Sequence, residues 1–422
     1  MRPNTLRLRS PADVVTAIPY LVGFHPTDSV VVLCCGGADG AYAIRLDLTA
    51  SDALLDHVTE LITRRRPADV ILTGYGPGVR VTPVVERVGD RLARDGVRLR
   101  EVLRVEDDRY WSYLCTDPAC CPPEGTFVDA RGSAVAAAAI AGGLVALPDR
   151  EELARMIAPV GGEAMRQATD RAERRLTSWA EAIATEGGRT TDAAAAIPSG
   201  ADSGAAGSGG AASCASVQGC AASGGAASGG AGSGTAIPGG AAAGGSTSVD
   251  SLNAGPAPAG PAEVGVSTAG VARAVAERGG VARRVVEEGV RLVRLLIERA
   301  RAGGDPPTDE EVAWLGVLLV NLRVRDEAWV RIDDGEIGAH IRLWRDVVRR
   351  VAEPYLPGPA CLLAFAAWRA GEGALANLAL DRALAADPHY SMARLLHELF
   401  VSGLPPWSVP LDITPEQLDE AS

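Results

Sequence analysis

A long tract of small residues in the middle of the chain sets the first limit on what this sequence can fold into. From Gly187 to Gly270 the chain is mostly Ala, Gly, Ser and Thr, with almost no large apolar side chain. Such a tract cannot bury enough apolar surface to offset about 1 to 2 kcal/mol of backbone entropy for each residue that becomes ordered. We therefore predict a disordered insertion over 187–270 that separates two foldable parts.

The part before the insertion alternates between strand and helix patterns. Ser10-Pro11-Ala12-Asp13 places a hydroxyl N-cap before a proline and an acidic residue, so a helix is expected to begin there. Further helices are predicted over 52–66, from Thr82 to near Gly96, and over 133–146; strands are predicted at 30–33, 42–48, 69–73, 99–105, 110–114 and 126–128. Gly36–Gly40 predicts a hairpin turn, and 110–114 should run antiparallel to the strand before it. These elements predict a three-layer α/β domain with a mixed sheet over 1–150.

The remaining segments predict helices only. We expect helices over 151–186, an all-α domain over 271–405 and a tail over 406–422, with a capping box at Thr308–Glu311. Residues 359–404 resemble one tetratricopeptide unit, on the positions Gly371, Ala376, Leu380, Ala383 and Pro388. The aromatic positions of that repeat fall on Ala360 and Ala367, and one unit cannot form the usual groove. A helical hairpin inside a larger bundle is the expected result.

The most unusual segment runs from Arg109 to Thr126 and reads Arg-Tyr-Trp-Ser-Tyr-Leu-Cys-Thr-Asp-Pro-Ala-Cys-Cys-Pro-Pro-Glu-Gly-Thr. It holds three aromatic side chains and three of the eight Cys, in a chain that is 4% aromatic. Its prolines and Gly125 predict a stiff, turn-rich loop. A thiol-rich loop is therefore expected at the end of a strand.

This segment, together with Leu8-Arg-Ser-Pro-Ala-Asp13 and Gly23-Phe-His-Pro-Thr-Asp-Ser29, resembles an actinobacterial domain-of-unknown-function family. The resemblance covers roughly the first 150 residues and, more loosely, the helical C-terminal part. It implies no activity, substrate or cofactor, so the residues themselves have to indicate where chemistry could occur.

The cysteines of the loop are candidate metal ligands. Cys115, Cys120 and Cys121 offer three soft thiolates, which suit zinc or an iron–sulfur cluster. Their spacing is not that of a standard zinc knuckle, and no second pair follows at the usual distance. A fourth ligand would have to come from Cys34, Cys35 or His25. The alternatives are that the three thiols are structural, or that they serve redox or nucleophilic chemistry.

A nucleophilic Cys115 would need a base, and His is the usual partner at neutral pH. His25 precedes a predicted strand and could reach the loop at a sheet edge, with Asp28 or Asp117 to orient its ring. The competing interpretation is that His25 packs in a turn and that both aspartates accept hydrogen bonds from loop amides.

Two further features suggest contact with a ligand. Gly74 and Gly76 lie between a predicted strand and a predicted helix, where backbone amides attract anions, although the spacing matches no phosphate-binding fingerprint. Residues 79–82 should also separate these glycines from the helix start, which favours an ordinary turn. Arg109, Tyr110 and Trp111 are further candidates because they lead into the cysteine loop.

Composition limits the classes of partner. The formal charge is −12 and no part of the chain is basic, which argues against a nucleic-acid footprint and against attachment to an anionic membrane. Every basic side chain other than His is Arg, so a Schiff-base or phosphate-binding lysine is excluded. No apolar signal core occurs at the N-terminus, so we expect a cytoplasmic protein with free thiols. Two hypotheses stay open: a non-catalytic module that binds a protein or a small molecule, and a Cys/His-dependent or thiolate–metal hydrolase or transferase. No cofactor, substrate or oligomeric state follows from the sequence.

Overall fold

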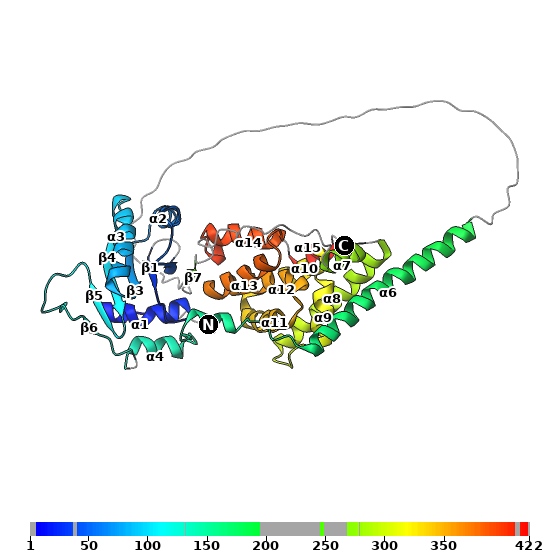
Figure 1. Cartoon of the computed structure of the whole chain (residues 1–422), viewed down its shortest axis with the longest axis horizontal. Coiled ribbons are helices and arrows are strands. Elements are labelled where there is room, and N and C mark those ends of the chain that lie inside the picture. Colours follow the sequence, from blue (N-terminus) through cyan, green and yellow to red (C-terminus); the bar gives the residue numbers. More distant parts are fainter. Residues whose placement is uncertain are drawn as a thin grey trace, which may run out of the picture. The chain divides into compact units, whose positions relative to one another are not determined.

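The computed structural model describes residues 6–36, 40–130, 132–194, 245–248, 268–277, 279–409 and 414–420 (Figure 1). The elements before the insertion are α1 (Pro11–Val22), β1 (Ser29–Cys35), β2 (Tyr42–Asp47), α2 (Asp52–Arg65), β3 (Asp69–Tyr75), α3 (Gly78–Arg94), β4 (Leu99–Glu106), β5 (Arg109–Ser112), β6 (Thr126–Phe127) and α4 (Ala134–Ala141). Strands and helices therefore alternate as the sequence predicts.

The strands form one mixed sheet in the order β6-β5-β4-β3-β1-β2, to which β7 (Gly245–Ser248) adds at the β2 edge. The strand β1 runs antiparallel to both β2 and β3, and Ser29 lies opposite Asp47 on one side and Tyr75 on the other. The pair β3 and β4 is parallel, whereas β5 and β6 return antiparallel. Both predicted hairpins are thus present, as is the short edge strand that contains Phe127.

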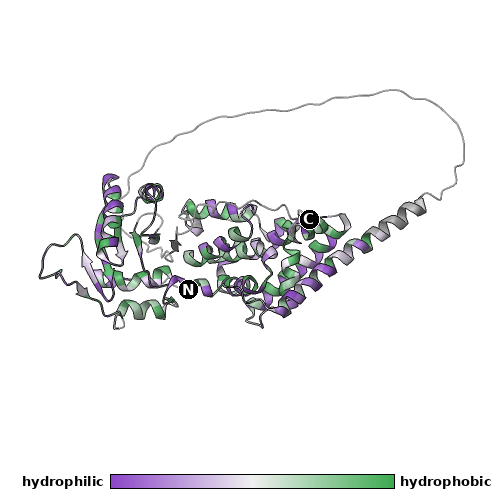
Figure 2. Cartoon of the chain, in the orientation of Figure 1, coloured by the Kyte–Doolittle hydropathy of each residue, from purple (hydrophilic) through white to green (hydrophobic). Residues whose placement is uncertain are grey.

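Helices cover both faces of this sheet (Figure 1). On one face, apolar side chains of α2 and α3 such as Leu55 and Val85 pack against Val30 and Val32 of β1. On the other face, Val14, Val15 and Ile18 of α1 pack against alternate residues of the same strands, and α4 packs beside α1. The three-layer α/β architecture is therefore confirmed. Figure 2 shows hydrophilic and hydrophobic residues alternating along α3, whereas α4 is mostly hydrophobic.

Helix starts follow the local signals in most cases. The Ser10 hydroxyl accepts a hydrogen bond from the Asp13 amide while the Asp13 carboxylate accepts one from the Ser10 amide, so the predicted capping box is formed. The expected start of α3 near Thr82 is wrong, because the helix begins at Gly78. The Pro77 carbonyl already accepts hydrogen bonds from the Arg80 and Val81 amides, and a proline with φ −59° is preset for a helix N-terminus.

The rest of the described chain is helical apart from β7. Its elements are α5 (Arg150–Arg155), α6 (Glu163–Ala194), α7 (Thr268–Ala276), α8 (Gly279–Arg301), α9 (Asp309–Leu318), α10 (Leu322–Val330), α11 (Ile337–Arg350), α12 (Pro357–Arg369), α13 (Gly373–Ala386), α14 (Ser391–Val401) and α15 (Pro415–Glu420), with short 3-10 turns at 334–336, 353–355 and 406–408. Helices α12 and α13 pack against each other as a hairpin. An all-helical C-terminal part is confirmed.

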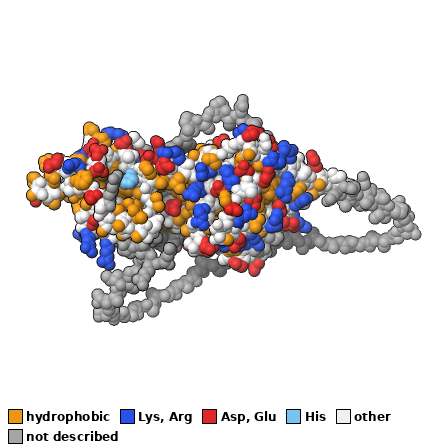
Figure 3. Space-filling model, turned by 90° about the horizontal axis from the view of Figure 1, so that it is seen from below, with side chains coloured by type: hydrophobic (Ala, Val, Ile, Leu, Met, Phe, Trp, Pro, Cys, Tyr) orange, Lys and Arg blue, Asp and Glu red, His pale blue; other side chains and the backbone are white. Residues whose placement is uncertain are grey.

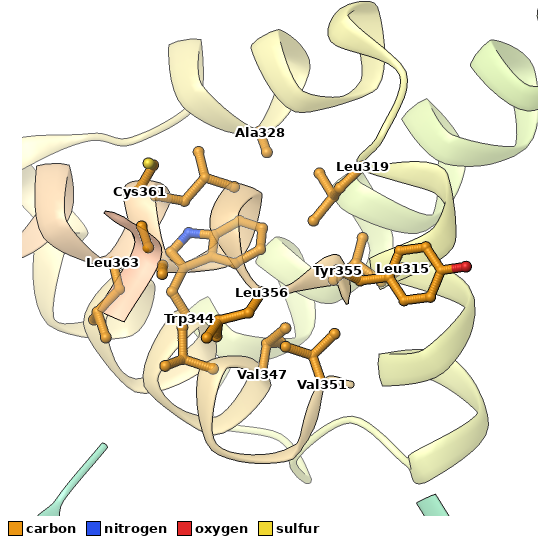
Figure 4. Close-up of a cluster of buried hydrophobic side chains, with 14 of the residues drawn as sticks. Leu315, Leu319, Ala328, Trp344, Val347, Val351, Tyr355, Leu356, Cys361 and Leu363 are labelled. Atoms are coloured by element: carbon orange, nitrogen blue, oxygen red, sulfur yellow. The ribbon is translucent and has the colours of Figure 1, made fainter. Parts of the chain in front are cut away.

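The core of the helical part surrounds Trp344, which is fully buried (Figure 4). Leu319, Ala328 and Val347 approach its ring from the end of α9, from α10 and from α11, while Cys361 lies beside it on α12. Four consecutive helices therefore share one apolar cluster. On the face in Figure 3, Arg side chains alternate with Asp and Glu over the helical part, so neither charge forms a separate patch there.

The predicted insertion falls largely outside the described residues. Within 187–270, the structure describes only the end of α6 as far as Ala194, the strand β7, and the first turn of α7 from Thr268. Cys214 and Cys220 lie outside the described residues. Among the residues that are described, no helix combines the length and the apolar character needed to cross a membrane.

Candidate functional site

The cysteine loop begins where β5 ends and is fixed to that strand by Ser112. The Ser112 hydroxyl donates a hydrogen bond of 2.7 Å to the Glu101 carboxylate on β4. The same oxygen accepts hydrogen bonds from the backbone amides of Leu114 and Cys115, each 3.2 Å long. The position of Cys115 relative to the sheet is therefore set by backbone contacts that do not involve its thiol.

The far end of the loop returns to Trp111. The indole N–H of Trp111 donates to the Pro123 carbonyl at 2.9 Å, and Arg109 donates to the Gly125 carbonyl at 2.7 Å. Gly125 has φ +80°, and a Cβ atom on it would lie 2.5 Å from the indole ring. Only glycine allows this turn to lie against the ring, so the loop is closed on both sides of the cysteines.

Between these anchors a tight turn gathers the three thiols. The Asp117 carbonyl accepts hydrogen bonds from the amides of Cys120 and Cys121 at 3.1 and 2.7 Å. As a result the Sγ atoms of Cys115, Cys120 and Cys121 all lie within 4.8 Å of one another. Cys120 is exposed and the other two are half-buried, so solvent reaches the group. Adjacent cysteines point apart in an extended chain and can bind one ion only where the backbone turns, and such a turn is present at Cys120 and Cys121.

The thiols influence each other's ionisation. A hydrogen bond with Cys121 is the main cause that lowers the pKa of Cys115, with a second contribution from the Asp117 backbone. The same hydrogen bond raises the pKa of Cys121 to about 12. The shared hydrogen bond therefore favours the thiolate form of Cys115 and the thiol form of Cys121.

The suggested fourth ligands lie elsewhere in the sheet. Cys34 and Cys35 end β1, which is separated from β5 by both β3 and β4. Cys34 is fully buried in the apolar layer under α2 and α3, and burial is the main cause that raises its pKa to about 12. His25 precedes the opposite end of β1. Among the described residues, none of these side chains joins the group of three thiols.

The proposed catalytic residues are likewise distributed over separate places. The His25 amide donates to the Leu147 carbonyl at 2.9 Å, and its side chain is exposed. The Asp28 carboxylate is paired with Arg80 of α3 at 2.8 Å. The Asp117 carboxylate accepts from the Ala119 amide at 2.9 Å. The sheet order thus places His25 and Asp28 near β1, with two strands, β3 and β4, between them and the strand that leads to Cys115.

Gly74 lies in β3 and Gly76 follows it, and the two glycines have different roles. A Cβ atom on Gly74 would lie 2.2 Å from a methyl group of Val81, so this glycine allows α3 to pack closely on β3. Gly76, with φ +126°, turns the chain into α3, and a Cβ there would lie 3.2 Å from the Asp28 carboxylate. Since α3 begins at Gly78, Gly76 lies directly before the helix, closer than the sequence suggested. The Asp28 carboxylate therefore lies beside the turn at Gly76.

Arg109 and Trp111 face the same side of the sheet as α3, whereas Tyr110 is 9% exposed and packs in the layer under α1. The Arg104 guanidinium lies 3.7 Å from the Trp111 ring centroid and also contacts Gly78. Val79, the residue after Gly78, is 84% exposed, and Phe127, which pairs with Arg109 across β5 and β6, is 61% exposed. We call Val79, Arg104, Arg109, Trp111 and Phe127 the Trp111 surface.

Comparison with known proteins identifies the family of this chain. Residues 11–228 and 246–407 match the family described as Domain of unknown function (DUF4192). The chain belongs to the DUF4192 family. No curated protein and no solved structure matches it. The membership expected from the sequence motifs is thereby confirmed.

Three residues of the Trp111 surface were not found from the sequence of this DUF4192 protein. Arg104 lies opposite Trp111 on the neighbouring strand, and Phe127 lies opposite Arg109, so only the register of the strands shows that they share one side of the sheet. Val79 was placed in a loop because α3 was expected to begin later. Polar and apolar residues alternate over 103–106, and this pattern could have indicated that Arg104 and Glu106 lie on one side of β4, opposite Leu103 and Val105. In the structure Leu103 and Val105 are buried.

Proposed function

We propose that this protein is a non-catalytic binding module whose Trp111 surface contacts another protein. The observations that carry the proposal are the exposure of Val79 and Phe127 and their placement: Val79 follows Gly78, which lies near the Arg104 side chain, and Phe127 pairs with Arg109 across β5 and β6. Large apolar side chains that lie together on a surface, rather than singly, mark interaction sites.

The chemistry of the Trp111 surface supports a protein partner. Trp, Phe and Arg are the residue types enriched at protein interfaces, and a buried Trp or Arg often dominates the binding energy. Arg104 is ion-paired with Glu106 and Arg109 donates to a backbone carbonyl, so neither guanidinium offers an isolated charge to an anionic ligand. The surface therefore favours an apolar contact with a polar rim.

Two contacts hold the Trp111 side chain in place. Trp111 is held by the carbonyl of Pro123 on one side and stacked on Arg104 on the other. Side chains that are ordered before binding lose less conformational entropy on association. This pre-organisation suits recognition better than a mobile surface would.

Site-specific photo-crosslinking in cells tests the proposal. A photoreactive residue at Phe127 is expected to give one discrete crosslinked product, and the same residue at Ile140 on α4 should give none. Both positions are 61% exposed, so accessibility is matched. Val79→Asp should abolish the product at position 127, because a charge would be placed in the interface. Equal crosslinking at both positions, or a product at 127 that survives Val79→Asp, would show the assignment to be wrong.

A further inference from the structure

The cysteine loop carries a second inference, which is independent of the Trp111 surface as an interface. We propose that Cys115, Cys120 and Cys121 bind one soft d10 cation, Zn²⁺ or Cu⁺, through three thiolates. Soft thiolate ligands select these ions over hard cations such as Mg²⁺ and Ca²⁺.

The separations between the sulfur atoms suit a single ion. Zinc–sulfur bonds of about 2.3 Å place neighbouring sulfurs about 3.8 Å apart in a tetrahedron and about 4.0 Å apart in a trigonal plane. The three Sγ atoms already lie within 4.8 Å of one another. Contraction by less than about 1 Å would complete the site, and rotation about χ1 of the exposed Cys120 can supply such a shift.

The hydrogen bonds that anchor the loop do not involve its sulfur atoms. The Cys115 amide donates a hydrogen bond to the Ser112 hydroxyl, and the Cys120 and Cys121 amides donate hydrogen bonds to the Asp117 carbonyl. Neither contact uses a sulfur atom, so the thiols are free to change partners while the backbone stays in place. We therefore expect metal binding to be separate from folding, unlike in zinc fingers, which are unfolded without metal.

The protein supplies three ligands and no more among the residues that the structure describes. No His, Asp or Glu side chain joins the three sulfurs, and the nearby Asp117 carboxylate already accepts a hydrogen bond from a backbone amide. A three-ligand zinc site keeps a fourth position for water or an exogenous ligand, whereas Cu⁺ is satisfied by three thiolates. Binding replaces the three S–H protons by the ion and releases them to solvent.

Cobalt substitution and competition between ions test the site. The purified full-length reduced chain is titrated with Co²⁺, and we expect one ion per chain with thiolate-to-cobalt charge-transfer absorption in the near ultraviolet. Zn²⁺ should displace Co²⁺ at one equivalent. A parallel titration with Cu⁺ under anaerobic conditions, in competition with Zn²⁺, shows which of the two ions is held more tightly.

Matched variants assign the ligands. Cys120→Ser and Cys121→Ser should each weaken Co²⁺ binding at least tenfold and reduce the charge-transfer band, while Cys35→Ser, which changes another half-buried thiol outside the loop, should leave both unchanged. Thermal melts of the metal-free variants check that they are folded. No charge-transfer band in the wild-type chain, or a band that Cys35→Ser reduces as much as Cys120→Ser does, would overturn the proposal. Because Val79→Asp alters neither the sulfurs nor their anchors, it should bind Co²⁺ like the wild type.

Discussion

At the scale of single residues, His340 is the most unusual ionisable group of the helical part. It lies on α11 and is fully buried, and neither ring nitrogen has a hydrogen-bond partner among the described residues. Burial lowers the pKa of His340 to about 4, and the positive charge of Arg301 adds to the effect. The imidazole is therefore neutral in the folded protein at neutral pH.

The position of His340 predicts an acid-dependent loss of stability. The unfolded chain takes up a proton near pH 6.5 and the folded chain only near pH 4, so stability falls as the pH drops through this window. The full effect is on the order of 3 kcal/mol. Chemical unfolding at pH 7 and at pH 4.5 should show a smaller difference in the free energy of unfolding for His340→Leu than for the wild type. The exposed His389→Gln variant should keep the wild-type difference, and an unchanged pH dependence in His340→Leu would contradict the interpretation.

At the scale of elements, the contact between β3 and α3 depends on one glycine. Gly74 faces Val81 and Val85 so closely that no side chain fits between the strand and the helix. The glycine-rich segment suggests a ligand contact at Gly74. Its neighbours in the structure instead support a packing role, which positions α3 and hence Val79 of the Trp111 surface.

Adding one methyl group at Gly74 should therefore destabilise the α/β domain. Gly74→Ala is expected to lower the free energy of unfolding by about 1 to 3 kcal/mol, the usual cost of overpacking. Gly162→Ala is the matched control, since a Cβ there meets nothing within 4 Å. Combining Gly74→Ala with Val81→Ala should recover part of the loss relative to the sum of the single changes, because the second change makes room. Strictly additive losses in denaturant titrations would refute the packing role.

At the scale of the whole molecule, a long connection joins α6 to β7. The strand β7 runs parallel to β2, with Tyr42 opposite Gly245 and Arg45 opposite Ser248. A deletion of the entire predicted insertion would remove β7 together with the end of α6 and the start of α7. The low-complexity composition of 195–244 indicates that the fold does not depend on this shorter segment.

Deleting residues 205–234 should leave the cooperative unfolding transition in place. The twenty residues that remain between Ala194 and Gly245 can still extend about 60 Å. Shortening a connection from 50 to 20 residues changes the entropy of loop closure by less than about 1 kcal/mol, so we expect the melting temperature to move little. A scrambled sequence of equal length and composition over the same residues serves as the control. A broad, non-cooperative melt of the deletion, measured by circular dichroism or calorimetry, would show that the segment contributes to the fold.

The sequence by itself determined the features that depend on neighbours along the chain. The capping boxes at Ser10 and Thr308 are formed as predicted, because a cap needs only side chains three residues apart. The hairpins and the three-layer arrangement also follow from local turn residues and hydrophobic periodicity. The turn at Cys120 and Cys121 lies in the predicted turn-rich loop and is likewise local, because its hydrogen bonds join residues no more than four positions apart.

Only the tertiary structure decided which distant residues meet. The order of strands separates His25 from Cys115, and the register of β4 with β5 places Arg104 on Trp111. Tertiary packing also brings Gly74 against Val81 of α3, the helix that begins at Gly78. Strand order and register depend on contacts between segments tens of residues apart, and many alternative pairings satisfy the same local pattern, so no single stretch of sequence specifies them.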